Sequence, residues 1–378
     1  MRNYVVRRLL LFIPSLAALI LISFLLLRMA PGNPVERMMN QLPEMQDAGI
    51  STSHSAEQIK AYWIHRLGLD LPVFYFGISS LDEKSSAHSS WKKFLPKINF
   101  HRDNQFHRYL FGDGVLSKGI LHGDLGVSYI SGQPVLKLLS QRIPWSLFFI
   151  LLSILLAYLI SIPLGIKAAA KEGSAFDHFT GSLLSLLFSL PVFWVATLLL
   201  MTFSNPDVFA FFPASGVRPV EGFPADAGLF RKIGISIPYL ILPTICYTYS
   251  SLVFITRTVR SSMSQTLQQD FIRTARAKGL PKKTVLWKHA FRNALLPVIT
   301  IFSGVFPYLL GGSVIMESVF SIPGMGITIF QGIASQDYPV IMAVFLVTGI
   351  MTMCGFLLCD FLYAWADPRI SFAKTSRG

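Results

Sequence analysis

The composition of this 378-residue chain excludes most soluble proteins. Hydrophobic residues make up 52% and charged residues only 14%, against about 25% in a typical soluble domain. The apolar residues gather in long uncharged runs, which excludes a soluble globular enzyme, a disordered chain and a disulfide scaffold. A formal net charge of +13 would suggest nucleic-acid binding in a soluble protein. Whether that interpretation applies here depends on where the charges lie along the chain.

Six runs are long enough to cross a bilayer, which takes about 20 mostly apolar residues. The first is too long for the core of a signal peptide and has no small-residue cleavage site after it, so we expect a retained span. Five of the six runs contain no charged residue, and the last contains one, Asp360. We expect Asp360 to be hydrated or paired with a base near the cytoplasmic end of its span. The expected spans are Leu9–Leu27, Trp145–Ile166, Phe179–Phe203, Ile233–Thr256, Ala294–Met316 and Val340–Tyr363.

The charges divide between the two sides of these spans. One side carries sixteen basic and four acidic residues, while the other carries fifteen of each. Because basic loops stay in the cytoplasm, both termini and the loop 259–296 are predicted to be cytoplasmic. The basic excess is thereby explained by topology, and we expect a multi-pass protein of the cytoplasmic membrane with no nucleic-acid partner. The basic side comprises residues 1–8, 167–178, 259–296 and 364–378.

The loop after the first span, residues 29–144, is long and external in this topology. Within it, a helix is expected near Ser55–Leu67, with Ser55 as its N-cap. Residues 79–118 are polar and indicate an ordered surface insertion or a small subdomain. Six of the eight histidines fall in this loop at irregular spacing, so we expect no metal site. The three cysteines all lie in spans, where they are expected to act as small apolar residues.

No motif for catalysis or for nucleotide binding occurs in the chain. The sequence lacks G-x-S-x-G, H-E-x-x-H and the phosphate-binding G-x-x-x-x-G-K-[ST]. We therefore expect neither an enzyme nor a resident cofactor.

Residues 264–297 form the most informative segment. Ser264–Lys278 is predicted to be a helix stopped by Gly279, and Pro281 to open a second helix that ends near Asn293. Such a helix–turn–helix on the cytoplasmic side can sit in a groove of a soluble partner and pass rigid-body movement to the spans. A basic hairpin lying on the membrane surface is the alternative.

This segment resembles the cytoplasmic EAA loop of binding-protein-dependent ABC importer permeases. The similarity lies in DFIRTARAKGLP, residues 270–281, and HAFRNALLP, residues 289–297, and is closest to the dipeptide/oligopeptide/nickel branch. By this resemblance the residues that couple to an ATPase are Asp270, Arg273, Thr274, Ala275, Arg276, Gly279, Leu280, Pro281 and His289.

Shorter matches to the same family follow in order along most of the chain. Asn33 stands where the family usually has Asp, and residues 79–118 have the character of an insertion relative to the usual member. The matching stretches are PGNP at 31–34, LGLDLP at 67–72, GDLGVS at 123–128, ESVF at 317–320, PGMG at 323–326, DYP at 337–339 and DPRI at 367–370.

The resemblance implies an all-α polytopic protein with the six-helix type I ABC importer permease fold. It implies an N-terminal helix (1–28), an external loop (29–144), a five-helix core (145–363) and a cytoplasmic tail (364–378). It further implies a heterodimer with a second permease, two ATPase subunits that bind ATP and Mg²⁺, and an external solute-binding protein, with di- or oligopeptides as substrate.

Two other functions remain open from the sequence. A stand-alone secondary transporter or channel would show an internal repeat and polar groups at mid-membrane, and neither is found. A membrane enzyme or scaffold would use residues 79–118 as its working part.

Overall fold

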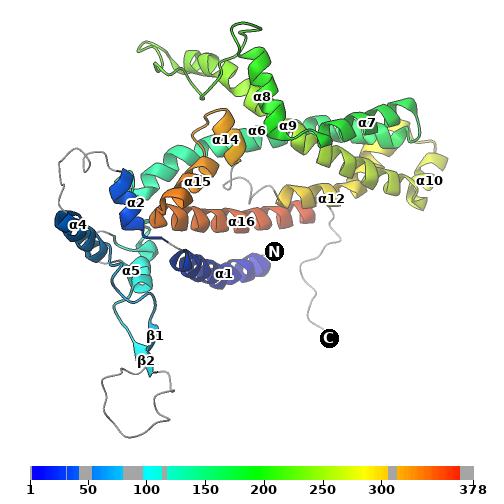
Figure 1. Ribbon diagram of the computed structural model, residues 1–378. Coiled ribbons are helices and arrows are strands. Elements are labelled where there is room, and N and C mark those ends of the chain that lie inside the picture. The colour runs from blue at the N-terminus through cyan, green and yellow to red at the C-terminus, as the bar shows by residue number, and fades with distance from the viewer. Residues whose placement is uncertain are drawn as a thin grey trace. The chain divides into compact units, whose positions relative to one another are not determined.

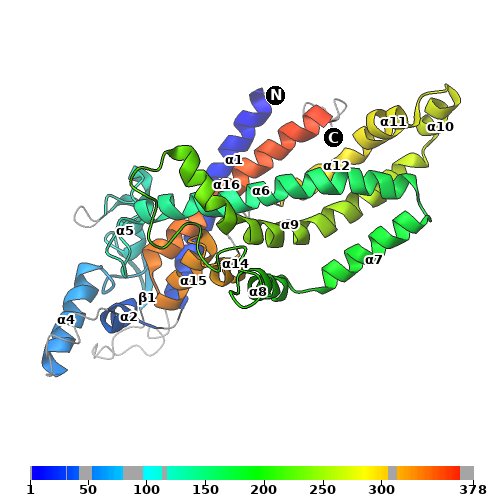
Figure 2. The same cartoon turned by 90° about the horizontal axis from the view of Figure 1, so that it is seen from above.

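The computed structural model describes residues 2–30, 32–41, 53–79, 97–112, 117–304 and 313–366 (Figures 1 and 2). The chain divides into two compact units. The first comprises Met1–Ala17, Gln141–Thr328 and Val347–Gly378, and the second comprises Ala18–Ser140 and Ile329–Leu346. The long helices α1 (Arg2–Met29), α6 (Val135–Ala170) and α16 (Tyr338–Ala366) contribute residues to both.

Four helices in the described part of the chain are long and apolar enough to cross a membrane. They are α1, α6, α9 (Leu229–Leu267) and α16, and a fifth span results if α7 (Ala175–Ser189) and α8 (Val192–Phe203) are counted together. Of the expected span Ala294–Met316, the structure describes parts of α12 (Phe291–Ser303) and α14 (Val314–Val319). The intervening residues 305–312 lie outside the described residues, as do parts of the 79–118 insertion and the tail after Ala366.

The prediction of one continuous helix over Phe179–Phe203 is wrong. The helices α7 and α8 meet at 90° across a short break. Leu190 there is extended, with ψ of 120°, and Pro191 follows it with ψ of 134°. A residue before proline is pushed away from helical geometry, and proline has no N–H to continue the hydrogen-bond ladder. A hydropathy count cannot detect this bend because both halves are equally apolar.

The core of the first unit forms where α6 and α9 pack closely. A Cβ at Gly165 would lie 2.8 Å from the Val259 side chain, so only glycine allows this approach. Asp360 near the end of α16 pairs with Arg8 at 2.5 Å, which confirms that the acid is matched by a nearby base. The cysteines are free, with Cys246 and Cys359 buried and Cys354 exposed.

A buried carboxyl organises the turn between α14 and α15 (Met325–Ser335). Glu317, 2% exposed, accepts hydrogen bonds from the Ser146 hydroxyl at 3.1 Å and from the Ile327 N–H at 2.7 Å. It thus satisfies a free N–H at the start of α15, while burial raises its pKa. A Cβ at Gly324 would lie 2.3 Å from this carboxyl group, which explains the glycine in this turn.

The second unit contains a small sheet, so the all-α prediction is wrong in this respect. Strands β1 (Phe76–Ser79) and β2 (Lys97–Phe100) pair antiparallel, with Phe76 opposite Phe100. Runs of four residues around polar sequence give too weak an alternation to predict strands. The unit also contains α2 (Pro34–Gln41), α4 (Ser53–Arg66), α5 (Gln105–Phe111) and the 3₁₀ turn η2 (Ile120–His122). The helix expected near Ser55–Leu67 is confirmed as α4, although it begins at Ser53 rather than after Ser55.

Candidate functional site

The first arm of the predicted helix–turn–helix is shorter than expected. The chain leaves α9 after Leu267 and resumes as α10 (Asp270–Ala277), so the predicted helix Ser264–Lys278 is interrupted at residues 268–269. Gln269 is extended, with ψ of 150°, and redirects the chain. Asp270 starts α10 and lies 3.3 Å from Arg273, and its carbonyl accepts a hydrogen bond from the Thr274 hydroxyl at 3.0 Å. The interruption lets α10 take its own direction.

Gly279 closes α10 as predicted. Its φ of +73° is left-handed, and its N–H donates to the Arg276 carbonyl at 2.9 Å while the Leu280 N–H reaches the Ala275 carbonyl at 3.4 Å. This is the way a helix commonly satisfies its last carbonyls through a C′ glycine. A Cβ here would meet nothing within 4 Å, so a substitution costs backbone strain of about 1–2 kcal/mol rather than an internal clash.

The second arm starts one residue later than predicted and is wound unevenly. Pro281 is the N-cap, with ψ of 140°, rather than the first helical residue. A single turn, α11 (Lys282–Thr284), leads into a π-helix, η3 (Val285–Ala290), which continues as α12. His289 is half-buried in the π-helix, and its carbonyl accepts from Asn293 at 2.8 Å. Short π-helical turns often mark functional segments because they shift the register of the following helix.

One face of the two arms is packed into the first unit. Ile272 is fully buried and Ala275 is 6% exposed, and they join Val285 and Ala290 of η3 in one apolar cluster. Fully burying a side chain such as Ile272 stabilises by about 1.5–3 kcal/mol. The same cluster includes residues of α6, α9 and α12, namely Ala157, Ile166, Ala169, Ile255, Val259, Met263, Ala294 and Val298. A force on α10 is therefore transmitted to three helices of the membrane core.

The opposite face of the arms is apolar and basic at once, and we call it the outer face. Phe271, Leu280 and Trp287 are 43%, 37% and 42% exposed. The two arms also carry five exposed bases that form no ion pair within the described residues: Arg276, Lys278, Lys282, Lys283 and Lys288. Exposed large apolar groups together with unpaired cations are typical of a surface that docks an acidic partner.

The nine predicted coupling residues differ in how deeply the structure buries them. Ala275 faces the buried cluster, whereas the other members of α10 and the turn are exposed and His289 is half-buried. The prediction missed Ile272, which anchors the arm, and the exposed Phe271 and Trp287. The i, i+3 spacing of Ile272 and Ala275 is the signal that predicts which side of so short a helix is buried.

A half-buried ion pair joins α7 to the same end of α9. Arg260 donates two hydrogen bonds to the Asp177 carboxylate at 2.6 and 2.7 Å, and Asp177 is 5% exposed. The carboxylate also accepts the Gly173 N–H at 3.1 Å. Bidentate pairs of this kind fix geometry as well as charge. From the sequence, Asp177 and Arg260 are predicted only to contribute to the charge of two cytoplasmic loops. The sequence does not show that residues 83 positions apart form an ion pair.

Comparison with known proteins identifies the class of protein to which this arrangement belongs. Residues 161–372 match the family described as the binding-protein-dependent transport system inner membrane component. This chain belongs to that family. The matched residues include α10, the turn at Gly279 and η3, so the sequence-based resemblance is confirmed for the segment that carries it.

Relatives at about one-third identity cover the whole chain. The oligopeptide transport system permease protein AppB of Bacillus subtilis (strain 168) is 33% identical over 98% of this chain and 100% of its own. The dipeptide permease protein DppB of Escherichia coli (strain K12) is 32% identical over 99% and 100%. YejB of Agrobacterium fabrum, a peptidoglycan transport system permease protein, is 30% identical over 99% of both. This chain is therefore a permease subunit of a binding-protein-dependent ABC importer, and the stand-alone transporter is not favoured.

Proposed function

We propose that this permease carries di- or oligopeptides across the cytoplasmic membrane as half of a heterodimer with a second permease. One of two separate ATPase subunits docks on the outer face of α10 and η3, the other docks on the second permease, and an external binding protein delivers the peptide. The relatives named for oligopeptides and dipeptides support the substrate class. ATP and Mg²⁺ belong to the ATPase subunits, because this chain has no phosphate-binding loop and needs no cofactor of its own.

The observation that carries the proposal is that the helix–turn–helix has one exposed face and one face packed into the membrane core. Its outer face offers Phe271, Leu280 and Trp287 to a partner, and its inner face is fused to the core through Ile272 and Ala275. When ATP closes the ATPase dimer, a docked α10 moves as a rigid body and takes the ends of α9 and α12 with it. The spans then switch access from one side of the membrane to the other.

A polar stripe on α9 supports a hydrophilic path beside this helix. Its exposed residues recur every three or four positions, which places them on one helical face. A polar group inside the span is costly against lipid, so this face of α9 is expected to line water or the second permease within the membrane and to open to the cytoplasm at the end of the span. The stripe consists of Ser250 within the expected span and of Arg257, Ser261 and Gln265 at its cytoplasmic end, with the exposed Phe254 on the same face.

Arg257 is the fixed charge of this stripe. Its guanidinium donates to the Ser185 hydroxyl at 2.9 Å and lies 5.4 Å from the centre of the Phe188 ring. A cavity of about 550 Å³ opens beside it, with Ser261, Gln265 and Pro297 also on its wall. A guanidinium held there can attract the carboxylate of a peptide in transit.

Arg257→Ala is expected to lower ATP-driven peptide uptake about tenfold, the equivalent of one lost charged hydrogen bond in the transport barrier. ATPase co-purification should be unchanged, because Arg257 is not on the outer face. The matched control is Arg231→Ala, which removes an exposed arginine paired with Asp226 at 2.9 Å. Uptake in proteoliposomes measures both variants, and equal activity of Arg257→Ala and the control would contradict a role in the path.

The proposed orientation places residues 259–296 in the cytoplasm and residues 204–232 outside. In a variant whose native cysteines are replaced, a cysteine at Val220, 98% exposed, should react with an impermeant thiol reagent in intact cells. A cysteine at Lys283 should react only after lysis. Labelling in the reverse pattern would invert the topology and place the outer face on the wrong side for an ATPase.

A further inference from the structure

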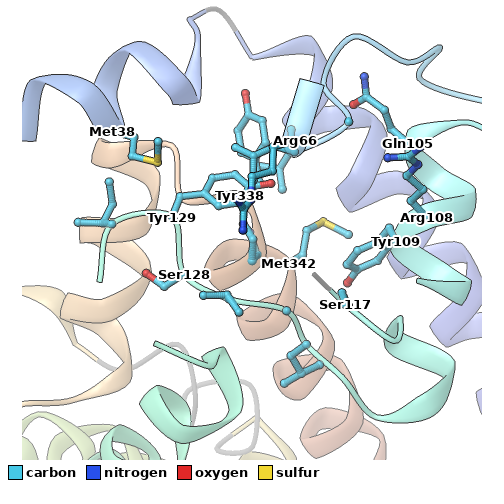
Figure 3. A pocket seen from close by; sticks show the side chains of 18 of the residues that line it. Met38, Arg66, Gln105, Arg108, Tyr109, Ser117, Ser128, Tyr129, Tyr338 and Met342 are labelled. Carbon is cyan, nitrogen blue, oxygen red and sulfur yellow. The ribbon is translucent and has the colours of Figure 1, made fainter. Parts of the chain in front are cut away.

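The second unit contains a cavity of about 490 Å³ that the transport mechanism does not use (Figure 3). Its wall includes the last turn of α1, the first turn of α16, α5 and the loop 124–132. The loop is tied to α16, because Asp337 accepts from the Ser128 hydroxyl at 2.5 Å and from the Tyr129 N–H at 3.1 Å. Burial raises the pKa of Asp337, although these hydrogen bonds oppose that shift. The cavity is thus built from interlocked elements.

The position of this cavity is fixed by the ends of two spans. Arg28 closes the apolar stretch Val5–Met29, and Tyr338 opens the stretch Tyr338–Ala364. The Arg28 guanidinium lies 5.0 Å from the centre of the Tyr338 ring and 5.3 Å from that of Phe24. Tyrosine and arginine at span ends mark the boundary between hydrocarbon and headgroups. The cavity therefore opens at headgroup depth, with Leu27 and Met342 on its membrane side.

The charges in the wall are unequally satisfied. Arg108 donates to Asp103 at 2.9 and 3.0 Å, and Asp124 accepts the N–H groups of Lys118 and Gly126 at 2.8 and 2.9 Å. The backbone hydrogen bond from Lys118 lowers the pKa of Asp124, whose carboxylate is already bonded within the loop. Within the described residues, Arg28 has aromatic rings beside it but no carboxylate. Arg66, which also lines the cavity, lies against the rings of Tyr62 and Trp63 and likewise has no carboxylate beside it in the described part of the chain, so two cations in the wall are left without an anion.

Two further polar atoms in this wall lack partners. Gln105 is 7% exposed, and its amide nitrogen donates to the carbonyls of Leu69 and Leu71 at 3.1 and 2.7 Å, which leaves Oε1 unbonded. The Tyr109 hydroxyl is also buried without a partner, and in Figure 3 its ring borders the cavity beside Met342. Buried groups of this kind cost free energy unless a ligand or water bonds them.

We propose that this cavity holds the headgroup of an anionic phospholipid. The phosphate pairs with Arg28, a hydroxyl or amine of the headgroup donates to Gln105, and the acyl chains leave along Phe24, Leu27 and Met342 into the bilayer. A free anion would satisfy Arg28 but leave the apolar wall against water. An amphipathic anion matches the cation, the orphan acceptor and the apolar side together.

The test uses the full-length chain in its transport complex, purified in non-ionic detergent from membranes that contain phosphatidylglycerol. The wild-type complex should retain phosphatidylglycerol through repeated detergent washes, as quantified after extraction. Arg28→Gln should weaken that retention about tenfold, since it removes one charged hydrogen-bond partner. Arg28→Lys keeps the charge and should retain more than Arg28→Gln. Lys137→Gln is the matched control, because it removes an exposed base of the same unit outside the cavity.

A second measurement separates a lipid site from a site for any anion. Thermal unfolding of the complex in phosphatidylcholine nanodiscs should shift upward when phosphatidylglycerol is included, and Arg28→Gln should lose that shift. Glycerol 3-phosphate should not reproduce it, because it has no acyl chains. Equal phosphatidylglycerol retention by wild type and Arg28→Gln, or displacement of the lipid by glycerol 3-phosphate or a short peptide, would overturn the proposal.

Discussion

Gly279→Val is expected to abolish ATP-driven peptide uptake while leaving the chain inserted and folded. The backbone at 279 has φ of +73°, where a side chain with a Cβ costs about 1–2 kcal/mol and a β-branched one more. The turn must relax to remove this strain, which rotates Leu280 and the exposed side of α10 away from the partner. A valine at this exposed turn would also stand between the turn and a closely packed ATPase. Co-purification of the ATPase subunits and uptake by the reconstituted complex are the measurements.

Gly173→Val is the matched control for this prediction. Gly173 has φ of +76°, and a Cβ there also meets nothing within 4 Å. The two variants therefore carry the same local strain, but Gly173 lies in the turn between α6 and α7 rather than in the helix–turn–helix. Uptake should survive Gly173→Val far better than Gly279→Val. If both variants co-purify with ATPase and transport as wild type does, the turn is not a coupling element.

Ala275→Asp should detach α10 from the membrane core. Ala275 is 6% exposed and packs with Ile272 and Val285, with no base among its buried neighbours in the cluster. Burying an unpaired carboxylate costs several kcal/mol of folding free energy, which exceeds the free energy gained by burying Ile272. The short helix α10 is therefore expected to separate from the buried cluster. The ATPase then still meets the outer face, but its movement no longer reaches α9 and α12. We expect uptake to fall at least about tenfold and ATP hydrolysis to lose its dependence on the binding protein.

The same substitution two residues later provides the comparison. Ala277 is exposed on α10, so Ala277→Asp adds the same charge to the same helix without burying it. A surface change of this kind is usually worth no more than about 0.5 kcal/mol. Loss of coupling in Ala275→Asp but not in Ala277→Asp would assign the effect to the buried face. Equal loss in both variants would instead point to charge repulsion at the docking surface.

The sequence predicts well those features that depend on residues close together in the chain. The uncharged runs place α1, α6, α9 and α16 correctly, and Gly279 followed by Pro281 predicts the turn that the structure contains. The coupling role of the residues on α10 follows from the resemblance alone and stays a prediction. These signals need no knowledge of which distant residues meet.

The features that escaped prediction depend on tertiary contact or on short irregular segments. The 90° bend at Leu190 and Pro191 is hidden in an unbroken apolar run, and the break at residues 268–269 has neither glycine nor proline to mark it. The Asp177–Arg260 pair and the carboxyl of Glu317 on Ser146 join positions far apart in the chain. The π-helix η3 places Val285 and Ala290 in the cluster, and neither a glycine nor a proline within it marks its winding.

Site-specific photo-cross-linking at Leu280 tests the docking of the ATPase most directly. Leu280 is 37% exposed at the tip of the turn, so a photoreactive amino acid there should not disturb the buried cluster. In the intact complex it should label an ATPase subunit, with a yield that changes when ATP closes the ATPase dimer. The same group at Val220, expected on the other side of the membrane, should never label the ATPase. Labelling of the ATPase from Val220, or no ATPase labelling from Leu280, would contradict the proposed function.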